Sequence, residues 1–223
     1  MKAAFFDVDG TLTQQRVWGG LMDYFAVHGQ RRVTNILFLV YHYSLYFLFK
    51  LGLVDQLAFR APWSEHLSWY FRGFTSEQAQ NMWDWVLKER ISKMWRQDVR
   101  HILQQHKQAG DIVFLVSGGP EGLLENIARE VGADHAVGTR HEKRNGRYTG
   151  RASSVACQGE GKVQNTRQRI TELGLEINMA DSSAYADSIG DIHLLEWVGN
   201  PVAVYPDESL AQVARERDWR IFP

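Results

Sequence analysis

The sequence predicts an α/β fold in which a doubly wound, Rossmann-like parallel sheet carries an inserted helical domain. Short, continuously apolar segments recur along the chain, and such segments are typical of strands buried on both faces of a parallel sheet. Helix-like segments separate them, as the crossovers of a parallel sheet require. A long stretch without strand-like alternation, residues 18–93, lies between the first predicted strand and the second.

In the first half of the chain, the predicted strands and helices alternate on either side of this insertion. The first strand is Ala3–Phe6, and Asp7 and Asp9 follow it directly. A helix over residues 102–108 ends at Gly110, because glycine is a common helix stop. The second strand follows at residues 112–116 and runs into small polar residues. The next helix is predicted over residues 121–131.

In the second half, residues 135–153 alternate around Asn145-Gly146, which is the strongest short hairpin signal. A helix that contains Lys162 is predicted next, and a third strand then runs into Asp187. The remaining pattern predicts a strand, a helix and a terminal strand. The predicted ranges are 161–173 for the first helix, 182–188 for the third strand, and then 201–206, 208–217 and 219–222.

These elements divide the chain into a Rossmann-like catalytic core, residues 1–15 and 96–223, and a helical cap, residues 16–95. Ligands of doubly wound sheets bind beyond the carboxyl ends of the strands. Asp7, Ser117 and Asp187 each follow a predicted strand, so we expect them to converge at one edge of the sheet.

Composition narrows the classes of function. The formal net charge of -1 gives no basic excess for a nucleic-acid backbone. The single cysteine, Cys157, is compatible with a reducing cytoplasm, and Asp7 and Asp9 interrupt any signal-peptide-like apolar segment at the start of the chain. We therefore expect a cytoplasmic protein that has no nucleic-acid partner, and no obligate protein partner is evident.

The residues at the expected sheet edge suit magnesium and phosphate. Magnesium takes oxygen ligands and bridges carboxylates to phosphate. An aspartate can attack phosphorus, and a second acid can protonate the leaving group and later activate water. Asp7 is therefore the expected nucleophile and Asp9 the expected acid and base, while Gly10 allows the backbone to turn sharply after them.

Four motifs, "DVDGT", "VSGG", Lys162 and "ADSIGD", resemble in order and spacing those of the haloacid dehalogenase superfamily. The chain is most similar to subfamily IB, the phosphoserine-phosphatase-like branch, in which a helical cap of the C1 type lies between the first two motifs. The resemblance implies a magnesium-dependent phosphomonoester hydrolase, a phosphatase that acts on a small phosphorylated metabolite through a phosphorylated Asp7.

The resemblance also implies a role for each motif residue. Asp7, Asp9 and Asp187 would hold magnesium, Asp9 through its backbone carbonyl. Lys162 would balance the charge of Asp7 and the phosphate, and Asp191 would support Lys162 or a metal-bound water. The residues expected to contact substrate are Thr11, Ser117, Gly118, Arg16 and Arg60.

One departure from the family pattern bears on the substrate. Members specific for phosphoserine carry an acidic residue soon after the first motif, whereas this chain has Arg16 there. Arginine would repel the substrate ammonium, so phosphoserine is not the expected substrate. Arg72 is, like Arg60, a cap arginine that either faces substrate or is simply solvated.

Three other functions are compared with this one. Haloacid dehalogenation does not need a general acid, so the presence of Asp9 argues against it. A non-catalytic binding or regulatory protein would be favoured by loss of a motif, and none is lost. A lipid-phosphate phosphatase at the membrane surface shares the chemistry and differs only in its partner.

The apolar stretch 36–49 keeps the lipid alternative open. Only His42 and Ser44 interrupt it, and basic residues flank it. Its fourteen residues are short for a membrane span, which needs about 20. We expect it to form the core of the cap. An apolar face for a lipid or membrane surface, or a true span, is the alternative.

Overall fold

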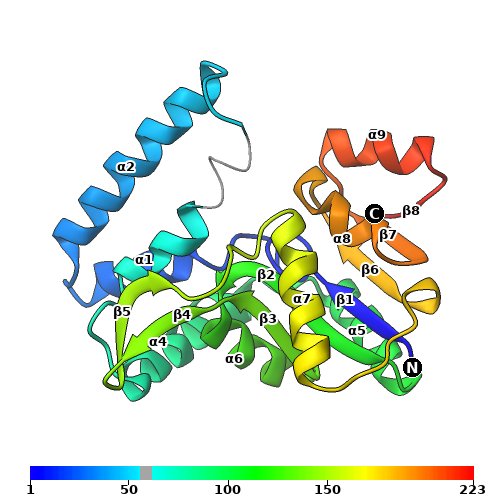
Figure 1. Ribbon diagram of the computed structural model, residues 1–223, viewed down its shortest axis with the longest axis horizontal. Helices are drawn as coiled ribbons and strands as arrows, with labels where there is room; N and C mark the ends of the chain where they lie inside the picture. Colours follow the sequence, from blue (N-terminus) through cyan, green and yellow to red (C-terminus); the bar gives the residue numbers. More distant parts are fainter. Residues whose placement is uncertain (56–61) are drawn as a thin grey trace.

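The computed structural model describes residues 1–55 and 62–223. Within these residues, six strands form one sheet in the order β3-β2-β1-β6-β7-β8, and every neighbouring pair is parallel (Figure 1). The strands are β1 (Ala3–Phe6), β2 (Ile112–Pro120), β3 (His135–Thr139), β6 (Ser183–Ala186), β7 (Asn200–Val204) and β8 (Arg220–Phe222). The predicted α/β class and parallel sheet are confirmed.

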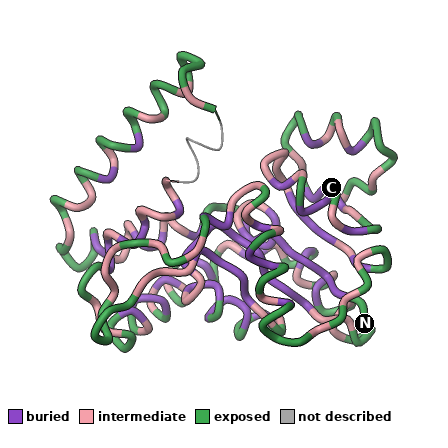
Figure 2. Tube along the Cα trace, viewed as in Figure 1, coloured by how far each residue is buried: buried purple, intermediate pink, exposed green. Residues whose placement is uncertain are grey.

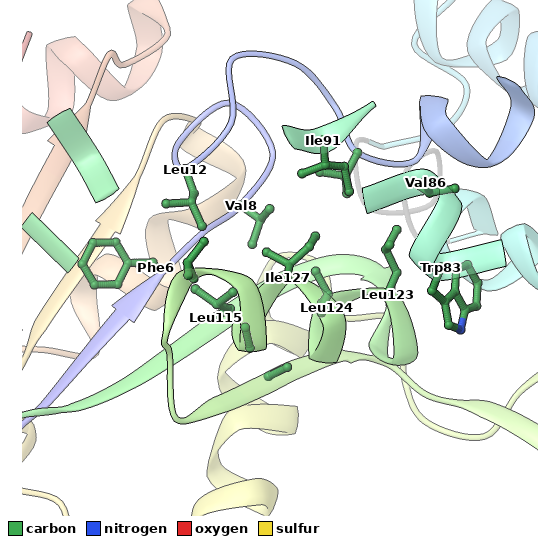
Figure 3. Close-up of a cluster of buried hydrophobic side chains, with 14 of the residues drawn as sticks. Phe6, Val8, Leu12, Trp83, Val86, Ile91, Leu115, Leu123, Leu124 and Ile127 are labelled. Carbon is green, nitrogen blue, oxygen red and sulfur yellow. The ribbon is translucent and has the colours of Figure 1, made fainter. Parts of the chain in front are cut away.

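Both faces of this sheet are buried, as the continuous apolar strands predict. Along β1, Ala4 and Phe6 join one hydrophobic cluster, while Ala3 and Phe5 join another on the opposite face. Helices α5 (Gln97–Gln108) and α6 (Glu121–Val131) contribute side chains to the first cluster. Part of that cluster, including Phe6 and Leu124, is drawn in Figure 3. The second cluster is covered by α7 (Glu160–Glu172), α8 (Ile192–Glu196) and α9 (Glu208–Glu216).

The segment 135–153 differs from its prediction as a single hairpin. Only β4 (His141–Arg144) and β5 (Arg147–Ala152) form the hairpin, and Asn145 and Gly146 turn it with φ angles of 50° and 74°. Residues 135–139 are β3, which pairs with β2 in the main sheet. The reason is that residues 136–139 are buried, so this strand belongs to the core, whereas the hairpin strands are only partly buried and form a separate ribbon.

The inserted segment is helical over its described residues, as predicted. It contains α1 (Gly19–Val27), α2 (Arg32–Lys50), a helical turn at residues 62–66, η1 (Leu67–Trp69), α4 (Ser76–Glu89) and η2 (Ile91–Lys93). Thr75 begins α4 with a capping box: its side chain accepts a hydrogen bond from the Gln78 amide, and its own amide donates to the Gln78 side chain.

The cap shares its hydrophobic core with one face of the sheet. Trp83 of α4 packs so closely on α6 that a Cβ at Gly122 would lie 2.8 Å from the indole nitrogen. The β4–β5 hairpin, which the predicted boundaries place in the core domain, also joins the cap. Its Tyr148 exchanges backbone hydrogen bonds with Gly73 and Phe74, at 2.7 and 3.0 Å. The domain boundaries themselves, 1–15 with 96–223 and 16–95, stay a prediction.

The expectation that residues 36–49 form the core of the cap is wrong. They lie in α2, the long helix at the outer side of the cap, and only Phe38 and His42 of this helix are buried (Figure 2). Val40 and Phe47 are 61% and 64% exposed. Apolar residues lie on more than one side of the helix, but only the side that carries Phe38 and His42 is buried. None of the helices in the described part of the chain could span a bilayer.

Candidate active site

The carboxyl ends of β1, β2 and β6 bring the predicted residues to one edge of the sheet. Phe6 is level with Leu115 on β2 and with Tyr185 on β6, so the polar residues that follow lie side by side. The Asp7 amide donates to the Tyr185 carbonyl at 2.9 Å and continues the sheet pairing beyond β1. The parallel register therefore places Asp7 between β2, which continues through Ser117 to Pro120, and the carboxyl end of β6.

Lys162 lies in the first turn of α7 and is buried between two carboxylates. Its Nζ is 2.6 Å from Asp7 Oδ1 and 2.7 Å from Asp191 Oδ1, and less than a tenth of each side chain is exposed. Burial alone would lower the pKa of Lys162, but Asp191 and Asp7 outweigh it and raise the pKa above its ordinary value. The ammonium group therefore stays charged at any physiological pH.

The second oxygen of Asp7, Oδ2, is buried and has no hydrogen-bond partner among the described residues. Burial raises the pKa of Asp7 well above its usual value, and Asp191, Asp187 and Asp9 raise it further against the opposing charge of Lys162. A buried carboxylate oxygen without a donor is unfavourable unless a cation or an electrophile meets it. Asp7 Oδ2 is thus the open position of the site.

Asp9 is held by hydrogen bonds to both of its carboxylate oxygens. Oδ1 accepts from the Val17 amide at 2.5 Å, and Oδ2 accepts from the Ser117 hydroxyl at 3.2 Å. Burial raises the pKa of Asp9, against these hydrogen bonds and the charges of Lys162 and Arg16, which lower it. A carboxyl group that retains its proton more strongly than usual suits a general acid.

The side chain of Asp187 packs so closely against Gly10 that no residue type other than glycine would fit at position 10. Gly10 has φ +97°, and a Cβ there would lie 2.1 Å from Asp187 Oδ2. The Thr11 hydroxyl, predicted to bind substrate, donates to Asp187 Oδ1 at 3.4 Å. Burial raises the pKa of Asp187 to about 6, and the nearby charge of Asp191 adds to this effect.

The acidic residues fit a hard divalent cation. Carboxylate oxygens of Asp7, Asp187 and Asp191 lie within 4.8 Å of one another, and this all-oxygen donor set suits magnesium. The predicted metal set differs by one residue, since it contains Asp9 in place of Asp191. The Asp9 carboxylate is already occupied by Val17 and Ser117, and a role for its backbone carbonyl stays a prediction.

A cleft of about 480 Å³ opens above these carboxylates. Cap residues Trp18, Trp63 and Leu67 line it together with Arg16 and Gly118, which the sequence predicts as substrate contacts. Ser117 lies beneath it, fully buried.

The cap arginine Arg72 is not among the described residues that line the cleft. The side chain of Arg72 packs against Gly150 of the hairpin. Arg60 lies outside the described residues, so its predicted contact with substrate stays a prediction.

One contact that joins cap and core at the cleft has no signal in the sequence. Gln158 Nε2 donates to the Ser64 hydroxyl at 3.1 Å. Both groups crowd Gly118, where a Cβ would lie 2.0 Å from Gln158 Nε2 and 2.8 Å from Ser64 Oγ. The "CQGEGK" run marks the neighbourhood of Gln158, but no local pattern indicates that Ser64 would meet it.

Comparison with known sequences agrees with this geometry. A family model described as haloacid dehalogenase-like hydrolase matches residues 4–196. The phosphoserine phosphatase SerB1 of Mycobacterium tuberculosis is 33% identical, over 98% of this chain and 70% of its own length. A probable phosphatase of the same organism is 30% identical, over 98% of this chain and 74% of its own length.

Solved structures show the same fold. A Bordetella pertussis protein of unknown function superposes with a TM-score of 0.84 at 26% identity, covering 100% of this chain and 98% of its own. A substrate-bound phosphoserine phosphatase superposes with a TM-score of 0.63, covering 99% of this chain and 92% of its own. Its identity is 17%, so this second likeness concerns the fold alone.

Asp187→Asn is expected to stabilise the protein when a chelator is present. Because burial raises the pKa of Asp187 to about 6, its ionised carboxylate destabilises the folded state. This destabilisation is complete above that pH and absent below the pKa of Asp187 in the unfolded chain. We expect the melting temperature to rise by about 2–4 °C at neutral pH, the shift that about 1 kcal/mol produces at this chain length. The gain should shrink as the pH falls towards about 4.

Circular dichroism melts of both proteins test this prediction. Asp181→Asn, which removes an exposed carboxylate, is the matched control and should change little. Magnesium should raise the melting temperature of the wild type more than that of Asp187→Asn. A lower melting temperature for Asp187→Asn in chelator would show that the carboxylate is not under electrostatic strain.

Proposed function

The chain belongs to the haloacid dehalogenase-like hydrolases and is a phosphatase, and we propose that it hydrolyses phosphomonoesters through a phosphorylated Asp7. The observation that carries this proposal is the state of Asp7. One of its oxygens is bound to Lys162, and the other is buried, unpartnered and next to the cleft. An oriented carboxylate with one free oxygen is suited to act as a nucleophile.

In the first half of the proposed reaction, Asp7 Oδ2 attacks the substrate phosphorus. The bond from phosphorus to the ester oxygen breaks, and Asp9 gives its proton to that oxygen. The Val17 and Ser117 hydrogen bonds hold the Asp9 carboxyl in one orientation. Lys162 offsets the negative charge that gathers around Asp7 during the transfer.

In the second half, Asp9 accepts a proton from water as the water oxygen attacks the acyl phosphate. The bond from phosphorus to Asp7 breaks, and the carboxylate and inorganic phosphate are released. We propose that Asp7, Asp187 and Asp191 hold magnesium, with the Asp9 carbonyl as a further predicted ligand. When bound, magnesium supplies positive charge that reduces the repulsion between the carboxylates and the phosphate.

The proposed substrate is a small phosphorylated metabolite without an ammonium group near the phosphate. Apart from the catalytic and metal-binding aspartates, none of the described residues that line the cleft is acidic. Arg16 lines it near the general acid, and Trp18 and Trp63 supply aromatic surface. An amine would find no carboxylate of its own there and would meet the positive charge of Arg16.

Two alternatives differ in the strength of their support. The aromatic wall of the cleft would also accept the apolar part of a lipid phosphate, so this class belongs in the same substrate screen. A non-catalytic role is disfavoured, because Asp7, Asp9, Lys162 and Asp191 are all present and assembled. Cytoplasmic residence stays a prediction.

Asp7→Asn is expected to abolish phosphatase activity. The amide is a poor nucleophile and cannot form an acyl phosphate, so hydrolysis of para-nitrophenyl phosphate should fall to background in the presence of magnesium. Excess chelator should have the same effect on the wild type. Asp23→Asn, which removes a half-exposed carboxylate of α1 that is paired with Arg90, serves as the control. Wild-type activity in Asp7→Asn would refute the proposed mechanism.

Asp9→Asn is expected to lose the most activity on substrates whose leaving group must be protonated as it departs. A general acid contributes about 10²–10⁴-fold, and a nitrophenolate needs it least. The rate with an alkyl phosphate should therefore fall far more than the rate with para-nitrophenyl phosphate. Steady-state kinetics with the two substrates provide the measurement, and equal losses would exclude Asp9 as the acid.

Arg16→Glu is expected to shift substrate preference towards amines. The readout is the ratio of kcat/KM for phosphoserine to kcat/KM for its analogue without the amine. This ratio cancels any effect of Arg16 on Asp9, because both substrates share it. We expect it to be low in the wild type and to rise about tenfold in the variant, since a charge repulsion becomes an attraction. A ratio unchanged by the variant would place Arg16 away from the substrate.

A further inference from the structure

The outward face of α2 is a continuous apolar stripe. Its members follow the spacing of one helical face, three or four residues apart. We name it the outer stripe, and it consists of Val33, Ile36, Val40, Tyr43, Phe47 and Leu51. These side chains are between 57% and 71% exposed. An outward helix face in a water-soluble domain is normally polar, so an exposed apolar stripe of this length indicates a surface that binds a partner.

The opposite face of the same helix already has its contacts. Phe38 and His42 point into the cap, and each ring lies 4.8 Å from Trp63, which lines the catalytic cleft. The outer stripe is therefore a second apolar face of α2, separate from the face that packs into the cap. Beside it, the hydroxyl of Ser44 donates to the Val40 carbonyl at 2.8 Å, which satisfies its hydrogen without water.

Charge identifies the kind of partner. Between Asp23 and Asp55 the chain has no acidic residue. Arg32 and Lys50 stand at the two ends of α2, about five full turns apart, so both lie along the same edge of the stripe. An apolar helix face with cations at both ends matches an anionic lipid surface, in which the stripe meets acyl chains and the cations meet headgroups.

The same charges disfavour a second copy of this chain as the partner. Two-fold pairing of outer stripes would place either Arg32 beside Lys50, or each of them beside its own equivalent. The stretch between Asp23 and Asp55 provides no carboxylate to pair with them. Like charges facing each other without an acidic partner oppose such an interface.

We propose that the outer stripe of α2 docks this protein on an anionic lipid bilayer. The helix lies in the plane of the interface, because no helix among the described residues could cross the membrane. Tyr43 suits that depth, since its ring is apolar and its hydroxyl reaches the headgroups. The contact is peripheral and reversible, and it does not depend on the identity of the phosphatase substrate.

Vesicle co-sedimentation of the full chain tests this proposal. The wild type should sediment with vesicles of equal parts phosphatidylcholine and phosphatidylglycerol, and only weakly with phosphatidylcholine alone. The double variant Val40→Gln/Phe47→Gln should lower binding at least about tenfold, because it removes apolar contact from the middle of the stripe. Arg32→Gln should lower it about fivefold, and added salt should weaken wild-type binding.

Val155→Gln is the matched control, since it replaces an exposed valine of the core domain and should bind vesicles like the wild type. Circular dichroism melts check that each variant is folded, and Arg32→Gln remains as a test if the double variant is not. Failure of the wild type to bind anionic vesicles would overturn the proposal. So would a dimer in sedimentation equilibrium that Val40→Gln/Phe47→Gln dissociates, because a second copy would then cover the stripe.

Discussion

The ammonium group of Lys162 lies between the carboxylates of Asp7 and Asp191, 2.6 and 2.7 Å away, where almost no solvent reaches. None of the three charges would be tolerable there alone, because a buried ion without a counter-ion is strongly unfavourable. Together they tie the end of β1 to the start of α7 and to the turn after β6. The net negative charge that remains is what a divalent cation and a phosphoryl group can balance, so the same interaction orders the fold and prepares the site.

Two glycines allow charged and polar groups to approach this centre. A side chain at Gly10 would collide with Asp187, and one at Gly118 would collide with Gln158 and Ser64. The first contact keeps the carboxylates close enough to share an ion. The second brings a cap residue, Ser64, onto the core side of the cleft. Glycine therefore stands at the two positions of the site where neighbouring groups leave no space for a side chain.

The sequence by itself determined the core of the fold and which polar residues meet at one edge of its sheet. Continuous apolar strands implied a sheet buried on both faces, and the structure buries alternate residues of β1 in two separate clusters. Polar residues directly after such strands must meet at one sheet edge, so Asp7, Ser117 and Asp187 could be placed together from the sequence alone. These inferences succeeded because each depends on local periodicity and on a topology that such periodicity rarely leaves ambiguous.

Only the tertiary structure decided which neighbours the remaining residues would meet. The contact of Gln158 with Ser64 joins residues far apart in the sequence, and neither has a local signal for the other. Residues 135–139 became a strand of the main sheet because β2 had a free edge for them. The apolar stretch of α2 was wrongly expected in the cap core, because its sequence does not show which surfaces pack against it. Hydrophobicity is a property of the segment, whereas burial depends on whether another surface is present to cover it.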